Sequence, residues 1–118
     1  MLHTMNLKPE PFEYMACGTK TIELRLYDEK RRLIQVGDTL VFHHTEDSTR
    51  TLTAVVTALH CYPDFAALYD ALPLERCGYR PEELADASPS DMDAYYSREK
   101  QARYGVVGIE LQLKEEDA

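Results

Sequence analysis

A nine-residue stretch, residues 18–26, constrains the fold more than any other part of the chain. Its sequence is Gly-Thr-Lys-Thr-Ile-Glu-Leu-Arg-Leu. Successive side chains of a β-strand point to opposite faces, so one face is aliphatic and the other carries Glu23 and Arg25. Lys20 stands at the first position of this strand, where the alternation does not fix the direction of its ammonium group. The stretch therefore predicts a strand with one face in a core and an acid and a base on the other.

The hydrophobic pattern of the remaining chain predicts further strands and helices around this segment. Strands are expected at residues 3–7, 39–45, 50–61 and 105–113. Helices are expected at residues 10–17 and 64–72. This order indicates an α+β fold, a small mixed β-barrel with helices at its sides.

Two regions are less regular. Residues 27–35 are charged and predict a loop that Leu33 and Ile34 anchor to the core. Residues 73–91 contain three prolines and a glycine and predict a functional loop or lid, with a short helix at 81–84. Residues 89–103 are expected to be helical in pieces, with Met92 and Tyr95 facing inward.

Length and charge limit the class of protein. The 118 residues fit one domain spanning 1–118, with a disordered tail at 114–118. The net charge of −8 argues against a protein that holds long duplex DNA through its phosphates. Residues 1–32 nevertheless carry six bases against five acids. That contrast indicates either chance or a local electropositive mouth suited to one nucleotide or a short strand.

The cysteines and histidines predict no metal site. Cys17, Cys61 and Cys77 are an odd number at no metal-ligand spacing, which indicates reduced thiols in a cytoplasmic protein. His43 and His44 are adjacent, so on a strand they point to opposite faces and cannot share a metal ion. We expect no cofactor, no signal peptide and a monomer. We also expect no membrane contact, because no apolar run approaches the ~20 residues of a membrane span.

Four sequence blocks occur together in an order that resembles a known family. They are Gly18-x-Lys20-x-x-Glu23-x-Arg25, Lys8-Pro9-x-Pro11-Phe12, Val36-Gly37-Asp38, and Tyr95-Tyr96-Ser97 leading to Tyr104-Gly105-Val106-Val107-Gly108-Ile109. The set resembles the ASCH domain, a branch of the PUA-like superfamily, from about residue 3 to residue 113. The resemblance implies a small PUA-like mixed β-barrel flanked by two or three short helices.

The resemblance also nominates site residues. It implies a cleft between barrel and helices that contains Lys20, Glu23 and Arg25. The C-terminal block supplies the expected opposite wall: Tyr95, Tyr96, Ser97 and Tyr104. Tyrosines can stack on a base, and a carboxylate such as Glu23 can accept a hydrogen bond from an exocyclic amine. The plain structural alternative is a surface ion pair contributing roughly 0–1 kcal/mol, with the tyrosines filling the core.

Three functions remain open from the sequence. The first is binding of RNA or of a modified nucleoside at the cleft, through Lys20, Glu23, Arg25, Tyr96 and Tyr104. The second is an enzyme at the same cleft, with Lys20, Glu23 and Ser97 as catalytic groups, acting as a ribonuclease or as an amidohydrolase of the N4-acetylcytidine type. In the amidohydrolase pattern a threonine follows the lysine by three residues, and this chain has Glu23 there. The third is a regulatory module that recognises a protein or metabolite through residues 73–100.

Overall fold

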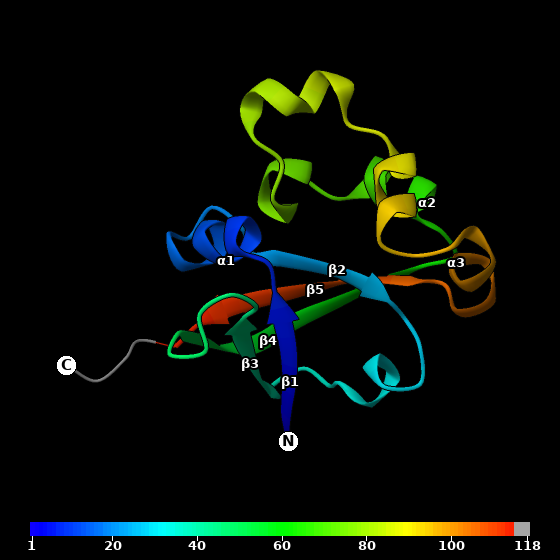
Figure 1. Ribbon diagram of the computed structural model, residues 1–118. Helices are drawn as coiled ribbons and strands as arrows, with labels where there is room; N and C mark the ends of the chain where they lie inside the picture. Colours follow the sequence, from blue (N-terminus) through cyan, green and yellow to red (C-terminus); the bar gives the residue numbers. More distant parts are fainter. Residues whose placement is uncertain (115–118) are drawn as a thin grey trace.

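The structure is a computed structural model that describes residues 1–114. Apart from its first residue, the tail expected at 114–118 lies outside the described residues. A five-stranded sheet runs through the molecule in the order β1-β3-β4-β5-β2 (Figure 1). Its strands are β1 (Leu2–Leu7), β2 (Ile22–Leu26), β3 (Thr39–His44), β4 (Thr51–Tyr62) and β5 (Val106–Leu113). β1 and β3 are parallel and the other neighbours are antiparallel, so the sheet is mixed, as expected.

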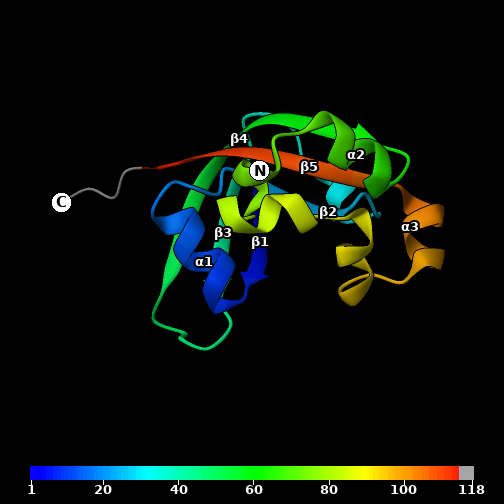
Figure 2. The ribbon, with the colours of Figure 1, turned by 90° about the horizontal axis from the view of Figure 1, so that it is seen from above.

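Short helices flank this curled half-barrel on more than one side. The α-helices are α1 (Pro9–Ala16), α2 (Phe65–Ala71) and α3 (Arg98–Tyr104). The 3₁₀ helices are η1 (Arg31–Leu33), η2 (Leu74–Cys77), η3 (Pro81–Asp86) and η4 (Pro89–Ala94). Seen from above, the segment from α2 to η4 crosses over the sheet between α1 and α3 (Figure 2). The α+β prediction is confirmed, and the helical region is richer than two or three helices.

Local sequence signals explain where the helices begin. α1 starts with a proline, whose missing N–H costs nothing in the first turn. The Asp64 carboxylate caps α2 by accepting a hydrogen bond from the Ala67 N–H at 2.8 Å. The Ser97 hydroxyl oxygen caps α3 in the same way, accepting from the Lys100 N–H at 3.2 Å. Each cap thus satisfies one of the N–H groups that the first helical turn leaves without an intrahelical partner.

Two apolar clusters lie on opposite faces of β5. Val107 belongs to the cluster that β1, β3, β4 and α1 share, whereas Val106 belongs to the cluster under α2 and η4. Adjacent residues of a strand point to opposite faces, so the sheet is covered on both sides here. Gly108 lets α2 come close, because a Cβ there would lie 2.7 Å from Leu72 Cδ1. β2, which carries Glu23 and Arg25 of the family motif and is called the signature strand below, contributes Ile22, Leu24 and Leu26 to the second cluster.

Two expectations about single side chains are wrong. Tyr95 does not face inward but is 61% exposed, while Met92 is buried. Tyr95 follows η4 as its C-terminal cap, and its ring contacts the Lys8 ammonium, with Nζ 5.4 Å from the ring centroid. In the loop after β2, Ile34 is buried as expected, but Leu33 is 64% exposed. The 3₁₀ helix η1 ends at Leu33 and the backbone becomes extended at Ile34, so the Leu33 and Ile34 side chains point in different directions.

No helix within residues 1–114 has both the length and the apolar character needed to cross a membrane.

Candidate functional site

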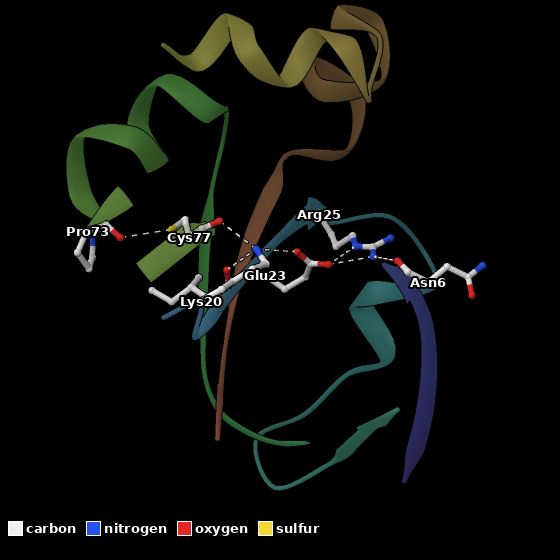
Figure 3. A network of polar contacts seen from close by, with 7 residues as sticks. Asn6, Lys20, Glu23, Arg25, Pro73 and Cys77 are labelled. Carbon is white, nitrogen blue, oxygen red and sulfur yellow. Dashed lines mark hydrogen bonds and ion pairs between the residues drawn. The ribbon is translucent and has the colours of Figure 1, made fainter. Parts of the chain in front are cut away.

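The Lys20 ammonium group is buried and fully hydrogen-bonded. Lys20 is only 5% exposed. Its Nζ lies 3.0 Å from the Ile22 carbonyl oxygen, 2.9 Å from the Cys77 carbonyl oxygen and 3.1 Å from Glu23 Oε1. An ammonium group has three protons to donate, and these three oxygens take them all. Lys20 therefore ties β2 to η2, two segments far apart in the sequence (Figure 3).

Gly78 follows η2 with a φ of 110°, which lies in the left-handed region that favours glycine. A Cβ at Gly78 would lie 3.5 Å from Lys20 Cδ and 3.6 Å from Nζ, which are ordinary van der Waals distances. The backbone conformation, and not a lack of space beside Lys20, therefore favours glycine at this position.

Glu23 lies between two cations. It is 6% exposed, with Oε1 toward Lys20 and Oε2 toward Arg25, 2.9 Å from Nη2 and 3.2 Å from Nε. Burial alone would raise the pKa of this carboxyl, but the charges of Lys20 and Arg25 outweigh burial and hold the pKa below its ordinary value. Glu23 is therefore an ionised carboxylate at neutral pH, with both oxygens occupied.

Arg25 extends this network to the far edge of the sheet. Its Nη2 also donates to the Asn6 carbonyl oxygen of β1 at 2.8 Å. β1 and β2 are the two edge strands of the sheet, and the strand pairing does not join them. The arginine thus bridges the two edges with a side-chain hydrogen bond where the half-barrel is open. In Figure 3 the polar contacts run without a break from Pro73 and Cys77 to Asn6.

A cavity of about 550 Å³ opens next to the end of β2. Its walls come from β2, the following loop, the η4–α3 connection and α3, and its lining residues are Leu26, Asp28, Glu29, Tyr95, Tyr96, Ser97, Lys100 and Tyr104. The volume falls in the range of roughly 300–1,000 Å³ that is typical of small-molecule sites. Three aromatic rings, two carboxylates, an ammonium group and a hydroxyl group thus surround one space.

Tyr96 connects the cavity to the buried charges. One side of its ring stacks on Phe65, with centroids 6.3 Å apart and an interplanar angle of 17°. Its backbone carbonyl accepts a hydrogen bond from Gln101 Nε2 at 2.9 Å. Burial raises the pKa of its phenol, and the neighbouring Arg25 opposes that shift. The ring therefore forms a wall of the cavity that is held from behind by the apolar cluster and by Arg25.

The structure divides the predicted site residues into two groups. Tyr95, Tyr96, Ser97 and Tyr104 come together around the cavity. Lys20, Glu23 and Arg25 form the buried network beside it and do not line it. Ser97 caps α3, and within residues 1–114 its side chain makes no hydrogen bond to Lys20 or Glu23. Direct contact between a ligand and the three charged residues thus stays a prediction.

Sequence reasoning missed the other lining residues. Asp28 and Glu29 follow β2 directly, in a stretch that is charged and reads as an ordinary surface loop. Lys100 lies four positions before Tyr104, a spacing that puts the two side chains on one helical face, and that was the available signal. The charged network also includes the backbone carbonyl groups of Cys77 and Asn6. Side-chain patterns in the sequence do not predict such backbone acceptors.

Across the part of the chain that the structure describes, no three histidine, cysteine or acidic side chains gather in a way that could hold a metal ion.

The family follows from comparison with known proteins. The sequence profile of the ASCH domain matches residues 5–115. The chain belongs to the ASCH domain family. Members of this family are generally associated with RNA. The resemblance of the four sequence blocks is thereby confirmed.

Several solved structures share this fold. The crystal structure of the hypothetical protein PH0355 superposes with a TM-score of 0.79 at 32% identity, over 97% of this chain and 100% of that one. The solution structure of PF0455 from Pyrococcus furiosus gives 0.68 at 33% identity, over 98% and 100%. The crystal structure of ASCH from Zymomonas mobilis gives 0.62 at 17% identity, over 94% and 66%, and shows the fold alone. No functionally curated protein matches the chain.

The ionisation of Glu23 gives a direct test of the network. Its pKa is lowered from 4.5, so its contribution to stability is complete above that pH and is lost as the pH falls through the folded-state pKa. We expect the carboxyl ¹³C resonance of Glu23 to titrate with a midpoint below 4.5 in the native protein. A Glu23 midpoint at or above the ordinary glutamate value of 4.5 would contradict the ion-paired arrangement.

Proposed function

We propose that the protein binds a nucleobase, as part of RNA or of a free modified nucleoside, in the cavity lined by Tyr95, Tyr96 and Tyr104. The observation that carries this proposal is the gathering of three tyrosines around one space of about 550 Å³. Base–aromatic stacking contributes about 1–3 kcal/mol per base and tolerates different bases. The general association of ASCH domains with RNA supports the same class of ligand.

The polar groups of the cavity suit a base with an exocyclic amine. Asp28 and Glu29 can accept hydrogen bonds from such an amine, as carboxylates do from cytosine N4. The Ser97 hydroxyl and the Lys100 ammonium can donate to a ring nitrogen or a carbonyl oxygen. Asp28 is already held by Arg31, with Nη1 to Oδ2 at 3.2 Å, which leaves Glu29 as the more available acceptor.

Binding fits the geometry better than catalysis by Lys20. A nucleophilic or basic lysine must lose a proton, and Lys20 gives all three of its hydrogen bonds to protein oxygens. The signature residues then act as support, since Lys20 and Glu23 fix β2 while Arg25 backs Tyr96. The three unpaired cysteines fit the reducing cytoplasm, where we propose the protein acts.

Removal of an exposed cavity wall tests the proposal. Tyr95 is exposed, so Tyr95→Ala should leave the fold intact while removing a stacking surface. We expect affinity for the best ligand among cytidine, N4-acetylcytidine, uridine, adenosine and a mixed-sequence RNA 8-mer to fall about tenfold, or ~1.4 kcal/mol, by calorimetry. Tyr14→Ala, on α1 and outside the cavity, is the matched control.

Three outcomes would contradict the proposal that the cavity binds a nucleobase. Equal losses from Tyr95→Ala and Tyr14→Ala would show that the cavity is not the site. Absence of binding by the wild type to every probe, with specific capture of a protein instead, would favour a regulatory module. Product formation from N4-acetylcytidine or RNA that Lys20→Arg abolishes at unchanged affinity would make the protein an enzyme, because arginine stays protonated at neutral pH.

A further inference from the structure

Basic residues gather around the cavity although the protein as a whole is acidic. The two segments that flank its mouth, residues 27–32 and 98–104, hold six basic and three acidic residues. The whole chain has a net charge of −8. Six bases less three acids give these two segments a net charge of +3, opposite in sign to that of the whole chain.

Hydrogen bonds bring these two segments side by side. The Tyr27 N–H donates to the Gly105 carbonyl oxygen at 3.0 Å, and Arg32 Nη2 donates to the Tyr104 carbonyl oxygen at 3.1 Å. The Arg103 guanidinium lies over the Tyr104 ring, 5.1 Å from its centroid. Arg32 and Arg103 therefore both contact Tyr104, a residue that lines the cavity.

The cations of this region differ in whether they are neutralised. Arg31 pairs with Asp28 at 3.2 Å, and Arg98 pairs with Asp93 at 2.9 Å. Within residues 1–114, no carboxylate lies within ion-pair distance of the other four cations: Lys30, Arg32, Lys100 and Arg103. All four are exposed, but only the last three line the cavity or contact Tyr104, which lines it. We call Arg32, Lys100 and Arg103 the basic rim.

We propose that the basic rim binds the phosphates that flank the base in the cavity, so that the ligand is a single-stranded nucleic acid segment rather than a free nucleoside. This inference rests on the proposed function, because it takes the cavity as the base site. A base must leave its stack to enter a cavity, which a single strand allows at low cost. The acidic surface elsewhere then repels the rest of a long strand and restricts binding to a few nucleotides.

Salt dependence measures the number of phosphates held. For a single strand, log K falls with log salt by about 0.7 per neutralised phosphate. Three rim cations therefore predict a slope of about −2, or roughly a 20-fold loss of affinity between 50 and 200 mM salt. We would measure this by fluorescence anisotropy with a fluorescein-labelled mixed-sequence RNA 8-mer.

The double variant Arg32→Gln/Arg103→Gln removes two rim charges outside the cavity lining. We expect its slope to fall to about −0.7, with affinity for the RNA 8-mer at 50 mM salt at least about tenfold weaker. Affinity for the nucleoside that binds best should fall much less than affinity for the RNA 8-mer, since a nucleoside carries no phosphate for the rim to bind. Arg50→Gln/Lys114→Gln makes the same change in net charge away from the cavity and should keep the wild-type slope.

The results separate this inference from the proposed function. Tyr95→Ala weakening the RNA 8-mer while the rim variant behaves as wild type would overturn the rim and leave the base site standing. The rim variant losing RNA while Tyr95→Ala has no effect would overturn the base site and, with it, the inference as stated. Duplex RNA of the same length binding as tightly as the single strand would also overturn it.

Discussion

Glu23→Gln should cost the fold about 3–5 kcal/mol, because it removes the anion that two buried cations share. Lys20 and Arg25 would keep their charges without the carboxylate that compensates them. Chemical unfolding should show a lower denaturant midpoint at an unchanged slope, which reports lost stability rather than altered compactness. The size of the effect follows from burial, since an exposed ion pair contributes only about 0–1 kcal/mol.

The control is an acid that carries no such role. Glu99 is exposed on α3, so Glu99→Gln should change stability by less than about 0.5 kcal/mol. A similar small loss for Glu23→Gln would mean that water reaches the network and screens it. That result would return Lys20, Glu23 and Arg25 to the role of an accessible charged surface, where a ligand could contact them directly.

Phe65→Ala should be as damaging to stability and should also weaken the ligand site. Phe65 is the first residue of α2, is almost fully buried and stacks on Tyr96. Truncating a buried phenylalanine to alanine costs about 3–5 kcal/mol through lost burial and the cavity left behind. Tyr96 would lose the ring behind it, so we expect nucleoside or RNA affinity of the folded variant to fall about tenfold, measured by calorimetry below its unfolding temperature.

Phe65→Leu separates these two effects. It keeps most of the buried volume, so the loss of stability should stay near ~1.5 kcal/mol or below. It removes the flat surface behind Tyr96, so part of the loss of affinity should remain. If affinity were unchanged in both variants, Tyr96 would not depend on Phe65 for its position, and the apolar cluster would have no part in shaping the cavity.

In our proposal the signature strand supports the ligand site without contacting the ligand. Its aliphatic face packs under α2, its charged face ties η2 and β1 together, and its end opens into the tyrosine-lined cavity. A mutation in the motif would then lower ligand affinity without any contact between the mutated side chain and the ligand. Measuring stability and affinity on the same variants distinguishes that indirect effect from direct recognition.

The sequence by itself determined the order and type of the main elements. Alternation placed β2, through Ile22, Leu24 and Leu26, and β5, while apolar and β-branched composition placed the other three strands. The carboxylate of Asp64 similarly marks the start of α2. The resemblance to the family also named one wall of the expected cleft, and the four residues of that wall do line the cavity: Tyr95, Tyr96, Ser97 and Tyr104.

Only the tertiary structure decided which charges are buried and where the cavity lies. Lys20 finds its partners in the carbonyl groups of Ile22 and Cys77, and Arg25 finds Asn6 across the open edge of the sheet. Every residue has a backbone carbonyl group, so the pattern of side chains does not predict which carbonyl groups will accept these hydrogen bonds. The exposed ring of Tyr95 likewise contacts a distant segment, since the Lys8 ammonium lies 5.4 Å from its centroid. The site depends on contacts between distant segments, which the fold alone brings together.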